Sequence, residues 1–95
     1  MAAEWGEPVP GGICRPGEAD PIAWFTMAIA GVGRWGTLGP GSPIRVVALV
    51  GTSPLEGGGM ITVPPGVYRV VVPLELQIDG TKVRLTSRGP LVRVV

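Results

Sequence analysis

The chain has 95 residues, enough for one small domain. It holds 16 Gly and 11 Pro, yet 45% of its residues are hydrophobic and only 16% are charged, which is too apolar for a disordered tail. With no His and a single cysteine, Cys14, it cannot form a His-based catalytic triad, a Cys/His zinc site or an internal disulfide. The net charge is +1 and the bases are spread along the chain, so we expect no nucleic-acid partner.

Residues 1–21 are rich in Gly and Pro and show no periodicity, which predicts an extended N-terminal arm. The arm carries Trp5, Val9 and Ile13, which a solvent-facing tail would not need, so we expect these side chains to anchor it on a partner or on its own domain. We expect the arm to be mobile in the free protein and ordered only in an assembly. Cys14 has no base or second cysteine beside it and is expected to be an inert small hydrophobe.

The segment Ile22–Ala30 has two readings. A helix is favoured by its possible end signals, which are Asp20 as the N-cap, Pro21 at the first helical position and Gly31 after the last one. A helix without any polar face would need burial on every side, which so small a domain can hardly give, and this favours a buried strand.

A glycine pattern follows at Gly31–Gly36, which matches the G-x-G-x-x-G motif of dinucleotide-binding folds. That motif needs a helix to begin inside it, and the following Gly- and Pro-rich residues 37–43 cannot form one. We therefore expect no cofactor, and a flexible turn that presents Arg34 and Trp35.

Two further strands are expected in the middle of the chain. Ile44–Val50 is apolar on both faces except at Arg45, as a central strand would be, and Met60–Val63 forms another. Between them, the 52–59 loop with Glu56 is expected to be a long exposed connection. It is not a phosphate-binding loop, because no Lys-Ser/Thr pair follows its glycines.

The clearest element is a hairpin formed by residues 74–78 and 81–85 around Asp79–Gly80, a strong signal for a two-residue turn. This turn sets residue 78 opposite 81 and Glu75 opposite Arg84 as an ion pair. Leu74, Leu76, Ile78, Val83 and Leu85 then share one face. Before the hairpin, Val67–Val72 is expected to be a strand that Pro73 separates from it. After it, Gly89-Pro90 is expected to turn the chain into a last strand, Leu91–Val95.

These elements predict a mainly β fold, a small β-barrel or β-sandwich at residues 22–95 with long Gly/Pro loops. No carboxylate has a second one placed for acid–base work, so we expect no enzyme and no metal. No membrane span or targeting signal is visible, so a soluble, cytoplasmic protein is the default location.

In its outline of an arm, a small β domain and long loops, the chain resembles the head-decoration (cement) proteins of tailed bacteriophages. The resemblance implies a virion location, with a homotrimer seated on the outer capsid surface and bound to the major capsid protein. It also implies that Trp5, Val9 and Ile13 anchor the arm, and that Arg34, Trp35 and the 52–59 loop with Glu56 make contacts.

We therefore expect a structural assembly protein, with a small β binding or accessory module of a larger complex as the alternative. Self-association into a closed ring favours the first, and a monomer with a concave apolar pocket favours the second. Salt-dependent binding to oligonucleotides would favour a third class, a small nucleic-acid module.

Overall fold

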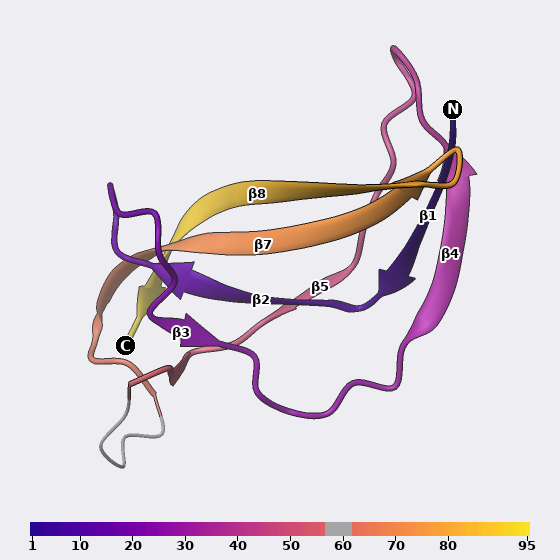
Figure 1. Cartoon of the computed structure of the whole chain (residues 1–95). Helices are drawn as coiled ribbons and strands as arrows, with labels where there is room; N and C mark the ends of the chain where they lie inside the picture. The colour runs from indigo at the N-terminus through magenta and orange to yellow at the C-terminus, as the bar shows by residue number, and fades with distance from the viewer. Residues whose placement is uncertain (57–61) are drawn as a thin grey trace.

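The computed structural model describes residues 1–56 and 62–95 of the chain, and these form eight strands and no helix (Figure 1). In chain order the strands are β1 (Ala2–Glu7), β2 (Val9–Cys14), β3 (Ala23–Trp24), β4 (Val32–Thr37), β5 (Ala48–Val50), β6 (Ser53–Pro54), β7 (Gly66–Ile78) and β8 (Thr81–Val94). No helix among these residues is long and apolar enough to cross a membrane.

The strands form one curled sheet in the order β4-β1-β7-β2-β3-β6, with β8 added on β7 and β5 on β2. All pairings are antiparallel except that of β2 with β5. The sheet closes only half-way, as a half-barrel, so the expected mainly β, barrel-like fold is confirmed.

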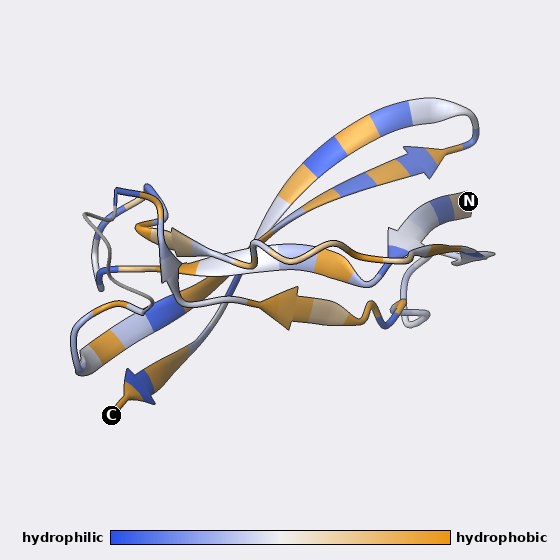
Figure 2. Cartoon of the chain, turned by 90° about the horizontal axis from the view of Figure 1, so that it is seen from below, coloured by the Kyte–Doolittle hydropathy of each residue, from blue (hydrophilic) through white to orange (hydrophobic). Residues whose placement is uncertain are grey.

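The hairpin of β7 and β8 confirms the register expected from the sequence. All five predicted pairs are present: Ile78 with Thr81, Gln77 with Lys82, Leu76 with Val83, Glu75 with Arg84 and Leu74 with Leu85. Asp79 and Gly80 have φ values of 49° and 83°, as a turn of this mirror-image type requires. Figure 2 shows the resulting alternation of hydrophilic and hydrophobic bands along the hairpin.

The expectation that Pro73 separates two strands is wrong, because β7 runs through it and Pro73 pairs with Thr86. On its other edge, β7 pairs with β2 at residues 69–71 and with β1 at residues 77–78. Pro73 lies between these two stretches, where the ladder requires no N–H group from β7. A proline is therefore tolerated inside a long central strand.

The expectation that Gly89-Pro90 turns the chain is also wrong, because β8 continues through both residues to Val94. Arg69 pairs with Leu91 and Val71 pairs with Arg88, so two residues of β8 stand opposite Val70 alone. This is a β-bulge, and Gly89 suits it because a Cβ there would lie 3.2 Å from that of Val70.

Residues 2–14 are corrected from a separate arm to two strands of the sheet. β1 pairs with β4 and β7, and β2 pairs with β3, β5 and β7. Ile13 and Cys14 have no exposed surface, and Ile13 packs with Ala23, Val63 and Tyr68 in the main hydrophobic core. The buried Cys14 agrees with the small hydrophobe that was expected.

The glycines that suggested an arm are instead needed for close packing. A Cβ on Gly12 would lie 1.9 Å from the carbonyl oxygen of Ala23 and 2.7 Å from Cε3 of Trp24, because β3 pairs with β2 at this position. A Cβ on Gly11 would lie 2.9 Å from the carbonyl oxygen of Val71. Two small residues therefore let β2 lie between β3 and β7.

Three other expected elements differ from the structure. In Ile22–Ala30, only Ala23–Trp24 is a strand and no helix forms. In Ile44–Val50, only Ala48–Val50 is a strand, and it is largely exposed rather than central. For Met60–Val63, residues 60 and 61 lie outside the described residues, while Thr62 and Val63 are not in a strand.

The expected turn at Gly31–Gly36 is instead most of β4, which pairs along its whole length with β1. Glycine is unfavourable in a strand and supplies no alternating side chains, so the pattern signals a turn. The ladder with β1, six residue pairs long, overrides that preference.

The sheet has an inner face, which carries the core, and an outer face. Register places Ala3, Ile13, Tyr68 and Leu76 on the inner face, and all four are buried. Because side chains alternate along a strand, Glu4, Arg69, Glu75 and Gln77 lie on the outer face.

We predict that Gly12→Ala destabilises the fold strongly, since its methyl group would meet backbone and ring atoms that cannot move independently. We expect a loss of about 3 kcal/mol or more in the free energy of unfolding, measured by urea denaturation. The matched control is Gly33→Ala, where a Cβ meets nothing within 4 Å, and this variant should be neutral or slightly stabilising. Equal effects of the two substitutions would contradict the packing role of Gly12.

Candidate functional site at the paired strands β1 and β4

The pairing of β1 with β4 decides which way the candidate contact residues face. Trp5 stands opposite Arg34, and both lie on the inner side of the sheet with Ala3. Glu4 stands opposite Trp35, and both lie on the outer side. The adjacent Arg34 and Trp35, expected as one contact pair, are therefore directed to opposite faces.

On the inner side, Glu7 is the centre of a polar cluster. Its carboxylate accepts a hydrogen bond from Nε1 of Trp5 at 2.9 Å and one from the backbone N–H of Val47 at 3.3 Å. Its other oxygen lies 3.5 Å from Nε of Arg34. Glu7 is the buried charged side chain among the described residues, and these partners compensate its lost hydration.

These contacts lower the pKa of Glu7 below its usual value. The largest cause is the hydrogen bond from the Trp5 indole, and the bond from Val47 and the charge of Arg34 act in the same direction. Burial acts against them but is outweighed. The cluster ties β1, β4 and the segment before β5 together, because its members come from all three.

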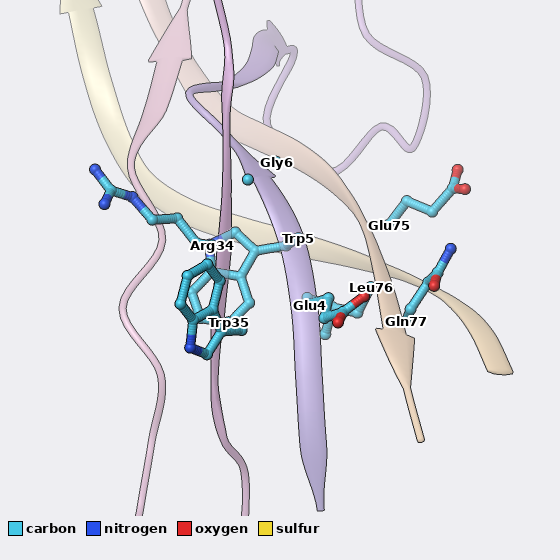
Figure 3. A pocket seen from close by; sticks show the side chains of 9 residues that line it. Glu4, Trp5, Gly6, Arg34, Trp35, Glu75, Leu76 and Gln77 are labelled. Carbon is cyan, nitrogen blue, oxygen red and sulfur yellow. The ribbon is translucent and has the colours of Figure 1, made fainter. Parts of the chain in front are cut away.

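A groove of about 400 Å³ lies between β4, β1 and β7 (Figure 3), and its lining includes residues of both faces. Figure 3 shows Arg34 and the two indole rings on one side of the groove and Glu75 and Gln77 on the other. Gly6 and Gly33 form part of its floor, and a Cβ at either position would meet nothing within 4 Å. Trp35 is 81% exposed, which is unusual for an indole.

Glu4 and Glu75 are the acidic residues that line this groove, and Glu75 stands in the hairpin. It accepts a close contact from Nζ of Lys82 at 2.9 Å, and Nε of Arg84 lies 3.7 Å away. The predicted ion pair with Arg84 is thus present, with Lys82 closer. The hydrogen bond and charge of Lys82 lower the pKa of Glu75, with a smaller effect from Arg84.

The structure brings only some of the expected contact residues together. Trp5, Arg34 and Trp35 all border the same groove. Val9 and Ile13 are buried within the protein's own sheet, so in this fold they are unavailable as arm anchors. Glu56 is exposed and borders a different pocket with Arg15 and Leu55. Residues 57–59 of the expected contact loop lie outside the described residues.

Sequence reasoning missed the role of Glu7. Trp5 and Glu7 are two residues apart, and in a strand this spacing puts both side chains on one face. The signal was present, but it has meaning only once residues 2–7 are assigned to a strand. Val32 was missed for the same reason. Leu85 was placed on the apolar face of the hairpin, but the sequence does not show that it stays half exposed.

A second group of features concerns exposed apolar side chains. Outside the core, large hydrophobic residues that remain exposed are Met1, Met27, Val32, Trp35, Val47, Leu49, Val50, Leu55, Val67, Leu85, Leu91 and Val95. Val32 is 53% and Leu85 is 50% exposed although both lie on the inner face. The open half of the barrel therefore leaves apolar surface that the chain itself does not cover.

The described residues contain no group of three or more His, Cys, Asp or Glu side chains placed to hold a metal ion. Comparison of the chain with protein-family models, curated proteins and solved structures found no match.

We predict that Glu7 makes stability fall as the pH is lowered. A depressed pKa stabilises the fold fully above the unfolded-state pKa, and this stabilisation is lost as the pH falls through the folded-state pKa. Glu7→Gln should be less stable than the natural protein at about pH 7, and the difference should shrink towards about pH 3.

The measurement is the urea midpoint at both pH values. Glu4→Gln, a substitution at an exposed residue on the other face of the same strand, is the control and should differ little from the natural protein at either pH. A gap between Glu7→Gln and the natural protein that does not change with pH would count against the cluster.

Proposed function

We propose that the protein is a structural subunit that completes its half-barrel against neighbouring protein subunits, foremost further copies of itself. The observation that supports this most directly is its excess surface. A folded monomer of 9.8 kDa exposes about 5,200 Å², whereas this chain exposes 6435 Å². The excess is larger than the roughly 800 Å² that one partner contributes to a standard protein interface.

The dimensions of the chain support the same proposal. Its radius of gyration is 14.8 Å, whereas a compact domain of this length has about 12.4 Å. Its extents are 43 × 27 × 19 Å, an elongated shape that leaves little interior volume. The chain also has no disulfide to replace a larger core.

A second copy of the chain is the partner that best fits the open inner face. Val32 and Leu85 offer apolar surface on this face, and a symmetric assembly would bury such surface against its own equivalent. Burying it would supply stability that the small core of one chain lacks.

The role of a virion cement protein, suggested by the resemblance to head-decoration proteins, is the specific form of this proposal. In that role the homotrimer would rest on a capsid lattice. Because residues 2–14 belong to the sheet, lattice contacts would be made through the exposed Trp35 and the Glu56 loop rather than through a free arm. The accessory-module alternative is the case of a different protein covering the same inner face.

We predict that the protein self-associates and that its thermal midpoint rises with protein concentration. Leu85→Glu should weaken this association at least about tenfold, since it puts a charge into the apolar contact, and sedimentation velocity would measure the loss. Leu91→Glu is the matched control, because Leu91 is equally exposed, at 52%, but lies on the outer face.

Both positions are half-exposed, so neither substitution should unfold the chain, and circular dichroism checks this. A natural protein that stays monomeric at all concentrations would refute self-assembly and leave the accessory-module alternative. Equal weakening by both substitutions would refute the inner face as the contact.

A further inference from the structure

The fold gathers most of the positive charge on one surface. Five of the eight bases lie on the outer face of the β7–β8 ribbon: Arg69, Lys82, Arg84, Arg88 and Arg93. In the sequence these bases look dispersed, which is why no nucleic-acid partner was expected. The register of the ribbon, including its bulge, is what places them together.

Less negative charge opposes them: Glu4 lies on the outer face of the neighbouring β1, and Glu18 borders a pocket with Arg69 and Arg88. Glu75 is the acidic side chain on the outer face of the ribbon, and it is already engaged with Lys82 and Arg84. Glu7 lies on the inner face with Arg34, and Asp79 lies in the turn, where it accepts a hydrogen bond from the N–H of Ala2. Five bases therefore stand against three carboxylates on and beside this face, which leaves it with a net positive charge.

The charges are also regularly placed. From residue 82 to residue 88, the outer positions of β8 are Lys82, Arg84, Thr86 and Arg88, without an apolar residue among them. Two residues of an antiparallel strand advance about 6.8 Å, which equals the rise of two base pairs at about 3.4 Å each. Arg84 is 79% exposed and Lys82 is 58% exposed, so both side chains can reach an external anion.

The backbone of β8 adds donors to this row. Among the described residues β8 pairs only with β7, so its far edge is open along the strand. N–H groups on an open edge are contacts for phosphate oxygens. A two-stranded ribbon also fits the major groove of B-form DNA, which is about 12 Å wide.

We propose that the outer face of the β7–β8 ribbon binds duplex DNA through its phosphates, without strong sequence preference. An acidic protein surface is less well matched, because a protein interface has an apolar centre. The exposed apolar side chains of this face, Val67 and Leu91, lie at one end of the ribbon, and the row from 82 to 88 has none. Single strands are less well matched, because the outer positions of the ribbon hold no aromatic side chain on which bases would stack. The surface lies opposite the inner face of the proposed assembly, so the two functions are compatible.

The experiment is fluorescence anisotropy with a labelled 20-base-pair duplex of arbitrary sequence, titrated with the full chain between about 50 and 200 mM salt. With three to four phosphates neutralised, the logarithm of the affinity should fall with the logarithm of salt with a slope of roughly −3. The double variant Lys82→Gln/Arg84→Gln should bind at least about tenfold more weakly and reduce the slope by about 2.

The matched control is Arg15→Gln/Arg45→Gln, which removes the same charge from exposed residues outside the ribbon and should leave binding nearly unchanged. Leu85→Glu separates this proposal from self-assembly, because a monomeric variant that still binds the duplex shows that the two surfaces act independently.

Three results would overturn the proposal. The first is the absence of salt-dependent binding, in which case the bases serve only to keep the open edge of β8 from pairing with other chains. The second is an equal loss in both double variants, which would remove the ribbon as the site. The third is tighter binding of polyglutamate than of the duplex, which would assign the face to an acidic protein.

Discussion

The architecture depends on one arrangement, the sharing of a single edge of β7 by two strands. β2 pairs with residues 69–71 of that edge and β1 with residues 77–78. Because β1 and β2 are consecutive in the chain, they diverge between these two positions. On its other side β1 pairs with β4, and β2 pairs with β3 and β5. The sheet therefore branches and curls instead of closing, which leaves the inner face of the hairpin partly uncovered.

The two branches are stabilised by different physics. The β2 branch holds the hydrophobic cluster of Ile13, Ala23, Val63 and Tyr68, with the Tyr68 hydroxyl donating to the carbonyl of Pro64 at 2.6 Å. The β1 branch has no comparable cluster among the described residues and is held by the polar contacts of Glu7. Apolar burial is insensitive to pH, whereas a carboxylate network is not. The two ends of the molecule should thus respond differently to acid.

The sequence predicts those parts of the fold that neighbouring residues determine by themselves. Asp79–Gly80 sets the turn, and alternation over residues 74–85 sets the faces, so the hairpin register was correct to the residue. β2 and β4 could not be predicted, because Gly11, Gly12 and Gly33 give no alternation. Gly11 and Gly12 are required by the close approach of β7 and β3, which the sequence does not reveal. Trp5, Arg34 and Trp35 were expected to be contact residues from their type, but only the ladder with β1 shows that Trp35 faces away from the other two.

The bulge at Gly89-Pro90 also limits which insertions and deletions the β7–β8 hairpin can tolerate. Before it, odd-numbered residues of β8 face inward, as Val83 and Leu85 do, and after it even-numbered ones do, as Val92 and Val94 do. One residue lost or gained between Gly80 and Gly89 would turn the far half of the strand inside out, bringing Arg93 into the core. Homologues of this chain should therefore vary here by compensated pairs of residues, one added to each strand of the hairpin, or not at all.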